Sequence, residues 1–583
     1  MTNKRSKFQQ RLLSLLMVLA ILFSMTACVT VPDGTQGSTQ LSGSNPSSST
    51  QIPHTSSTMT QPTTVPSEPS QPSTPVTTVP EQPVDPDALV YTLTEEDVQI
   101  FYTLLQECEE LALVGEDMEA IEEANTNLDE SYAYLNAQCS IAMILHYSHT
   151  KNAELEKQYL DCVEICTKAN DAYIQMARNV YLSDTPAKDA LFEGWTEEDI
   201  ADLLAYDEEI AKIQQRNAEI GVEYRATTSD ANKINLYIEF VQNNNRIAQF
   251  YGYENYYYYA YEKVYERDYD MAALAKMRQY AKDYLAKVFP NAMMNFVHSF
   301  NQEATYADRL AVQNFLFNDY TTVGTDYVGM YIESLPEDFA QIMNNMLEHD
   351  SLFTSAEDAM PGAFTTAIGD RSYCYFGPGY AVSSTVIHEG GHYYASRFTD
   401  LNGIPLDLAE VHSQGNEWLF ISFLQDKMPQ KQHNALVDYL LYEDIAMTLI
   451  CLMVDEFEQR VYSTDLTGFT AANFDAIMNE VSKSYYPNGS VKDDLADMNY
   501  YWRQVVVDQP VYYISYAISG VTAMSLYTVA QKDYTHAMEI YQKLCEEPVI
   551  EAGFLGNIKA AGLYTPFDKK FYQDLEALIQ SRG

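Results

Sequence analysis

Apolar residues recur with the spacing of α-helices along most of this chain. The pattern predicts long helical stretches from Leu93 to Tyr147 and from Ala153 to Tyr181, where Glu, Ala and Leu predominate. A further helix is expected after Thr196, because acidic residues follow it in the first turn. Alternation typical of strands is rare, and we expect it at Arg371–Tyr375 and in the stretch up to Val382. The pattern predicts a mainly α-helical protein with a small β-sheet.

The N-terminus departs from this periodicity. Basic residues precede an apolar run, Leu12 to Ala27, that is shorter than the roughly 20 residues needed to span a membrane. It ends in Ser24-Met25-Thr26-Ala27-Cys28, which resembles a bacterial lipobox. We expect residues 1–28 to be a lipoprotein signal peptide, with Cys28 lipidated and anchoring the chain to a bacterial cell membrane. An uncleaved anchor and a non-lipid signal peptide are the alternatives, and all three place the remaining chain outside the cytoplasm.

Residues 29–90 are mostly Ser, Thr, Pro, Gln and Gly, with few charges and no Lys or Arg. Such a segment buries too little apolar surface to order itself, so we expect a disordered, Pro-stiffened stalk. Residues 91–583 are long enough for two or three lobes that share cores. We expect a helical N-terminal part, 91–290, and a catalytic part, 291–583.

Candidate chemistry centres on His388-Glu389-Gly390-Gly391-His392, an instance of H-E-x-x-H. Histidines four apart lie on one face of a helix, so both imidazoles can reach one metal ion. Glu389 lies about 100° away around the helix, where it can touch a water rather than the metal. Two Gly residues inside a helix cost roughly 1 kcal/mol each relative to Ala, which indicates a close approach there. The pattern predicts a zinc hydrolase site with Glu389 as the general base.

A third ligand is expected on the next helix. Ala395 and Phe398 stand where a metzincin would carry Gly and His, so that class is excluded. Glu410 and Glu417 are seven residues apart and share a helix face. We expect Glu410 to be the third ligand and Glu417 to orient a ligand histidine. His412 projects about 200° from Glu410, which argues against it as a joint ligand.

HEGGH and the segment Ala409-Glu410-Val411-His412-Ser413-Gln414 together resemble the oligoendopeptidase F and Pz-peptidase branch of the thimet oligopeptidase family. The resemblance implies a gluzincin endopeptidase, a large two-lobed helical protein with one Zn²⁺ at the bottom of a deep channel that admits short peptides. It also implies that Glu410 is the third zinc ligand and Glu389 the general base. The spacing of 18 residues between His392 and Glu410 is shorter than the family leads us to expect.

Three weaker matches support this resemblance. Residues 236–256 with 266–269 resemble two helical segments of oligoendopeptidases, and residues 369–377 resemble the family's "G-A-Y-C" strand, whose edge would line the cleft. Gln509-Pro510-Val511-Tyr512-Tyr513-Ile514-Ser515-Tyr516 resembles the "P-F-Y-Y-I-D-Y" block. Tyr513 and Tyr516 are three apart, and we expect their hydroxyls to stabilise the oxyanion.

One departure from the family concerns a His that usually precedes this block. Val505-Val506-Val507 stands there, after Arg503. Either Arg503 takes over the role, or the activity is lower or altered.

Cysteines and charge narrow the functional classes further. Apart from Cys28 the chain has seven widely spaced cysteines, which do not indicate a disulfide scaffold. Cys162 and Cys166 share a helix face, and we interpret them as buried small hydrophobes. The net charge of -47 argues against a nucleic-acid partner. It also raises the hypothesis that cationic peptides are favoured in an acidic channel.

Together these patterns predict a monomeric zinc endopeptidase that cleaves short peptides outside the cytoplasm. The alternatives are a gluzincin exopeptidase and a peptide-binding lipoprotein of the same fold without turnover. The intact Glu389 argues against the binding protein, because binding alone needs no general base.

Overall fold

The computed structural model describes residues 86–204, 208–399, 404–486 and 509–582, together with residues 498, 503, 506 and 507. Within these residues the protein is mainly helical, with one three-stranded sheet, as predicted. No helix among them is both long and apolar enough to cross a membrane. The predicted signal peptide, Cys28, nearly all of the stalk and Val505 lie outside the described residues.

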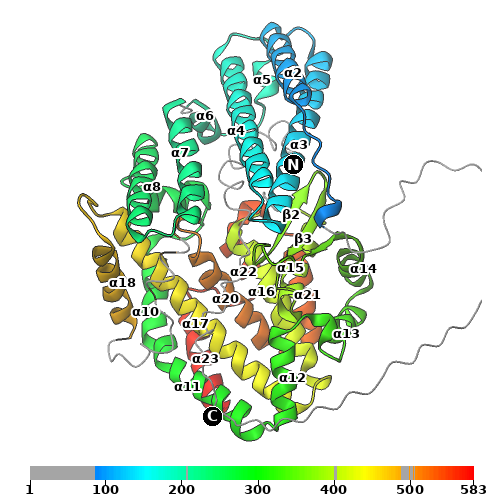
Figure 1. The fold of residues 1–583 in the computed structure, drawn as a ribbon, viewed down its shortest axis with the longest axis vertical. Coiled ribbons are helices and arrows are strands. Elements are labelled where there is room, and N and C mark those ends of the chain that lie inside the picture. Colours follow the sequence, from blue (N-terminus) through cyan, green and yellow to red (C-terminus); the bar gives the residue numbers. More distant parts are fainter. Residues whose placement is uncertain are drawn as a thin grey trace, which may run out of the picture.

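Three long helices, α2 (Glu95–Val114), α3 (Met118–Ser148) and α4 (Ala153–Leu182), form an N-terminal helical unit (Figure 1). The single stretch predicted from Leu93 to Tyr147 is therefore two helices. Gly115 ends α2 in a left-handed conformation with φ 68°, and the Asp117 side chain then caps α3. The unit has its own apolar core, centred on residues such as Phe101, Leu128, Leu135 and Tyr173.

The following helices are α5 (Lys188–Leu191), α6 (Glu197–Leu204), α7 (Glu208–Ala226) and α8 (Asp230–Phe250). The helix start predicted after Thr196 is confirmed, because the Thr196 hydroxyl accepts from the Asp199 backbone N–H. Beyond Gly252 the chain continues as α9 (Tyr256–Tyr259), α10 (Met271–Tyr280), α11 (Ala286–His298), α12 (Tyr306–Phe317), α13 (Tyr327–Ser334) and α14 (Glu337–Asn345).

The sheet comprises β1 (Ser351–Phe353), β2 (Ala363–Ile368) and β3 (Arg371–Phe376), in the order β1-β3-β2. β3 pairs in parallel with β1 and antiparallel with β2. The strand predicted at Arg371–Tyr375 is confirmed, but its extension to Val382 is wrong. Gly379 turns the chain with φ 82°, and Val382 already occupies the N-cap position of the next helix.

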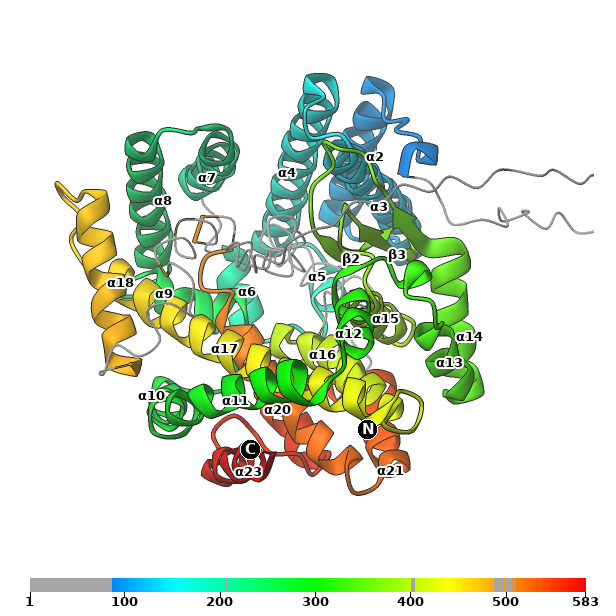
Figure 2. The same ribbon diagram turned by 60° about the horizontal axis from the view of Figure 1, so that its bottom comes forward.

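The C-terminal half consists of helices α15 (Ser383–Ala395), α16 (Leu406–Phe423), α17 (Gln430–Tyr462), α18 (Ala471–Tyr485), α20 (Ile514–Ala530), α21 (Tyr534–Glu546), α22 (Gly553–Ala560) and α23 (Lys569–Arg582). Helix α17 runs across the lower part of the molecule in Figures 1 and 2, with α15 and α16 behind it, near the sheet. Helix α16 packs against α15, α20 and α21.

One large apolar cluster extends along the chain from Ile220 to Ile579. The cluster contains residues on both sides of residue 290, so the predicted boundary between the N-terminal and catalytic parts does not divide the apolar core. That boundary stays a prediction about the order of the parts along the chain. A smaller cluster joins Met143 and Ile144 of α3 to Phe364 and Tyr375 of the sheet. The N-terminal helical unit is therefore packed on the sheet that adjoins α15.

Candidate active site

The HEGGH sequence lies on α15, and all five of its residues are buried. His388 and His392 are one turn apart, with ring centroids 5.2 Å from each other. Burial lowers the pKa of His392 well below its ordinary value, and nearby His388 lowers it further. A neutral imidazole keeps a lone pair for a metal ion, so His392 is held in the form that can ligate.

Gly391 explains how α16 approaches α15. A Cβ atom at this position would lie 2.2 Å from the backbone oxygen of His412, so a larger residue would force the helices apart. The Asn416 side chain of α16 donates to the Ile387 carbonyl at 2.8 Å and fixes the same contact. The close approach predicted from the paired glycines is therefore present, and the backbone of α16 is what comes close.

This approach brings Glu410 to the two histidines. Its Oε2 atom lies 3.9 Å from His388 Nε2 and 3.8 Å from His392 Nε2. Ligand atoms at about 2.0–2.2 Å from one zinc ion in tetrahedral geometry are about 3.3–3.6 Å apart, a few tenths of an ångström closer. His388 Nε2 is buried and has no hydrogen-bond partner among the described residues. The three predicted ligands therefore fit a Zn²⁺ ion with small side-chain movements.

Glu417 contacts one of the two histidines. His388 Nδ1–H donates to Glu417 Oε1 at 2.7 Å, which fixes the ring with its other nitrogen toward Glu410. Burial alone would lower the pKa of His388, but the hydrogen bond and charge of Glu417 raise it to about 9, with smaller contributions from Glu389 and Glu410. Buried carboxylates around two imidazoles form a site that favours a cation.

Glu389 is fully buried beside this cluster. Its Oε2 atom accepts from the Thr365 hydroxyl at 2.8 Å, whereas Oε1 has no hydrogen-bond partner among the described residues. Burial raises the pKa of Glu389 to about 7, although His388 and the Thr365 hydrogen bond act in the opposite direction. One oxygen is thus held, and the other can exchange a proton near neutral pH. Thr365 lies on β2, a strand that the sequence analysis did not predict.

Tyr512 is a site residue that sequence reasoning missed. Its hydroxyl donates to Glu410 Oε1 at 2.9 Å, while Ser413 donates to Oε2 at 3.2 Å. The "Y-Y" motif contained the signal, but its resemblance did not show which tyrosine faces the ligand. Tyr513 is buried and Tyr516 half-buried, with ring centroids 5.8 Å apart. Their oxyanion roles stay predictions.

Val511, immediately before Tyr512, has φ 62°, a conformation that β-branched residues rarely adopt. Buried groups hold it there. Its N–H donates to Glu458 Oε1 at 2.8 Å, and Arg267 donates to its carbonyl at 2.9 Å. Strain of this kind costs of order 1–3 kcal/mol and persists only where the surroundings impose it. The backbone that presents Tyr512 to Glu410 is therefore fixed from both sides.

Two other residues singled out from the sequence are also placed. His412 is buried on α16 with Nε2 at 3.1 Å from the Leu544 carbonyl, and it does not join the group of His388, His392 and Glu410. Arg503 donates to both carboxylate oxygens of Asp475, at 3.0 and 3.1 Å. This ion pair occupies the guanidinium group that the sequence analysis considered as a replacement for the histidine that usually precedes the tyrosine block in the family.

No protein-family model matches the chain, and no curated protein matches it. Solved structures do. Pz peptidase A, solved with an inhibitor, aligns with a TM-score of 0.66 at 17% identity, over 84% of this chain and 98% of that one. The chain has the oligoendopeptidase fold. A candidate oligoendopeptidase F from Bacillus anthracis aligns with a TM-score of 0.63 at 16% identity, over 84% of this chain and 96% of the other. Oligoendopeptidase F from Enterococcus faecium gives 0.55 at 11% identity, over 84% and 97%.

Proposed function

We propose that the chain is a zinc-dependent endopeptidase that hydrolyses short peptides outside the cytoplasm. The observation that carries the proposal is the buried cluster of His388, His392 and Glu410 with Glu389 beside it. A metal-binding protein without turnover would need the first three residues but not a buried carboxylate with a pKa near neutrality and one oxygen that has no hydrogen-bond partner among the described residues. The oligoendopeptidase fold, taken with the names of the similar structures, supports the same class of reaction.

Bound at this cluster, Zn²⁺ supplies Lewis-acid polarisation of the scissile carbonyl and makes a water more acidic. His388, His392 and Glu410 hold it, and Glu417 and Tyr512 keep two of these side chains in orientation. Glu389 Oε1 takes a proton from the attacking water and returns it to the leaving amine. Tyr513 and Tyr516 donate to the carbonyl oxygen as it becomes negative.

The sheet suggests where the peptide lies. The sequence analysis assigned the exposed edge to the strand at residues 369–377, but residues 374–376 of β3 pair with both β1 and β2, so that assignment fails for this half of the strand. Within the described residues β2 pairs only with β3 and leaves its other edge open. Because Thr365 of β2 touches Glu389, an extended peptide that pairs with β2 would pass the general base. The deep channel remains part of the proposal.

The location rests on the sequence alone. A lipid on Cys28 would tether the chain to a bacterial membrane, and the stalk would hold the catalytic domain away from it. Metabolic labelling with a fatty-acid analogue tests this directly, because Cys28→Ala should abolish the label. Label that persists in this variant contradicts the anchor without affecting the peptidase proposal.

The test of the activity is cleavage of a defined set of oligopeptides, with both termini blocked in half of the set. Internal cleavage of blocked peptides, lost with a chelator and in His392→Ala, is the expected result. Cleavage restricted to free termini would indicate the exopeptidase. Zinc bound without any cleavage would indicate the peptide-binding protein. Lys-rich and Glu-rich members at low salt test the charge hypothesis, which fails if their rates are equal.

A further inference from the structure

A second group of metal-ligating side chains lies in the N-terminal helical unit. Cys162 and Cys166 are one turn apart on α4, and Cys139 faces them from α3. The three sulfur atoms all lie within 4.8 Å of one another, and none of these cysteines is more than 2% exposed. The sequence interpretation of Cys162 and Cys166 as buried small hydrophobes lacked a third ligand, and α3 supplies it. We call this group the thiol cluster.

We propose that the thiol cluster is a binding site for a soft metal ion, Cu(I), separate from the active site. Thiolates select soft ions such as Cu(I) over the harder cations that carboxylates prefer. The two sites lie in different apolar cores, since the thiol cluster belongs to the core of α2–α4 and the active site to the large cluster.

The spacing of the sulfur atoms fits a three-coordinate ion. Sulfur ligands at about 2.3 Å from one metal in a trigonal plane are about 4 Å apart, so small χ1 rotations would close the present group around an ion. No fourth His, Cys or carboxylate ligand atom joins this group among the described residues. Structural Zn²⁺ sites are almost always four-coordinate, whereas Cu(I) is satisfied by three sulfur ligands, so the geometry favours Cu(I).

The thiol cluster is enclosed by the apolar core of α2–α4, where the Cys166 thiol donates to the Leu135 carbonyl at 3.5 Å. Polar groups in such surroundings are costly unless they are paired, and a bound cation would pair with the sulfur atoms.

The binding step balances without an oxidant or reductant. Cu⁺ forms three Cu–S bonds as the S–H bonds of the three thiols break and their protons pass to the solvent. Copper stays monovalent and no S–S bond forms. Binding of one monovalent ion would therefore be accompanied by the release of up to three protons.

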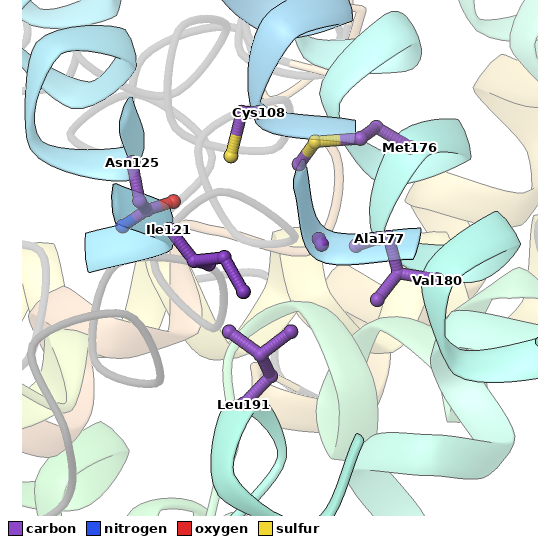
Figure 3. Close-up of a pocket in the computed structure, with 8 residues that line it drawn as sticks. Cys108, Ile121, Asn125, Met176, Ala177, Val180 and Leu191 are labelled. Atoms are coloured by element: carbon purple, nitrogen blue, oxygen red, sulfur yellow. The ribbon is translucent and has the colours of Figure 1, made fainter. Parts of the chain in front are cut away.

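Cys108 provides a matched control. It lies in the same helical unit and is 2% exposed, but its side chain faces a separate apolar cavity with Ile121, Met176 and Leu191 (Figure 3). That cavity is about 10 Å³, the lower limit for one water molecule. Cys108→Ala removes a buried thiol from the same core without touching the thiol cluster.

The experiment is Cu(I) competition against a chromogenic Cu(I) chelator, with the full chain purified, loaded with zinc and kept anaerobic under reductant. We expect one Cu(I) per chain that Cys162→Ala loses and Cys108→Ala keeps, and X-ray absorption should show sulfur neighbours alone. If Cys162→Ala does not fold, judged by circular dichroism, Cys139→Ala on the other helix replaces it.

Three outcomes would overturn the proposal. The first is the same Cu(I) stoichiometry in the wild type and in the cluster variant. The second is displacement of the bound Cu(I) by excess Zn²⁺. The third is nitrogen or oxygen among the nearest neighbours of the copper. Because none of these depends on peptide cleavage, failure of this proposal and failure of the peptidase proposal are distinguishable.

Discussion

The active site and the thiol cluster are built on the same plan. In each, one helix contributes two ligands at positions i and i+4, and the neighbouring helix contributes the third. His388 and His392 of α15 face Glu410 of α16, and in the thiol cluster two cysteines of α4 face one of α3. Two helices in contact are therefore enough to assemble three ligands, whatever their chemistry.

The contacts around the ligands distinguish the two sites. Glu410 and His388 each have a hydrogen-bond partner that fixes their orientation, and Glu389 stands beside them with an oxygen unpaired among the described residues. The thiol cluster lies in an apolar core, where the Cys166 thiol donates to the Leu135 carbonyl. The first arrangement can move protons in a reaction, whereas the second can only hold an ion. A substitution at Glu389 should therefore remove turnover while the active site keeps its metal ion. No substitution in the thiol cluster can separate turnover from metal binding in this way.

The largest expected effect is that of Glu389→Gln. The amide keeps the size of the side chain but cannot accept a proton from water, so kcat should fall about 10²–10⁴-fold. Zinc content, measured by elemental analysis, should remain at one ion per chain because Glu389 is not a ligand. Exposed Glu357→Gln is the control and should match the wild type. Loss of zinc together with activity in Glu389→Gln would contradict the separation of base and ligands.

Next in size are the tyrosines. If Tyr513 and Tyr516 donate to the oxyanion, either change to Phe should lower kcat by about 10²–10³-fold and leave zinc affinity unchanged. Tyr512→Phe should do the reverse and weaken zinc binding, because it removes the hydrogen bond to Glu410. Zinc competition with a fluorescent chelator and steady-state kinetics measure the two quantities. A kcat loss confined to Tyr512→Phe would assign the catalytic role to that residue instead.

Glu417→Ala should affect metal binding moderately. Loss of the 2.7 Å hydrogen bond to His388 leaves the ring free to turn, and such outer partners typically change metal affinity 10–100-fold. Zinc titration against a chelator checks this, with exposed Asp426→Ala as the control. Activity at saturating zinc should recover most of the wild-type rate. A permanent loss of kcat would mean that Glu417 also acts in the reaction.

Local sequence spacing explains why the active site was predicted from the sequence and the thiol cluster was not. His388 and His392 form a motif, and Glu410 follows on the next helix, so spacing alone limits the choices. Cys139 is 23 residues before Cys162, on a helix whose orientation the pattern did not fix. Thr365 and Tyr512 were missed for a related reason. Their contacts with Glu389 and Glu410 depend on a strand and on a backbone conformation that periodicity cannot specify.

The smallest expected effect tests whether the backbone before Tyr512 is strained. Val511 is buried, so truncating it costs apolar burial whichever small residue replaces it, and a comparison of Val511→Gly with Val511→Ala removes that shared loss. Gly adopts φ near 60° without the steric cost of a Cβ atom, so Val511→Gly should be more stable than Val511→Ala by about 1 kcal/mol. Denaturant unfolding of the two variants measures the difference.

Equal stability of the two variants would mean that residue 511 leaves the left-handed region once its side chain is truncated. Zinc affinity should then fall in both variants, because Tyr512 would no longer be presented to Glu410. If both variants are equally stable and keep full zinc affinity, the position of Glu410 does not depend on the backbone at residue 511. The ligands of the active site would then need no more support from surrounding residues than those of the thiol cluster.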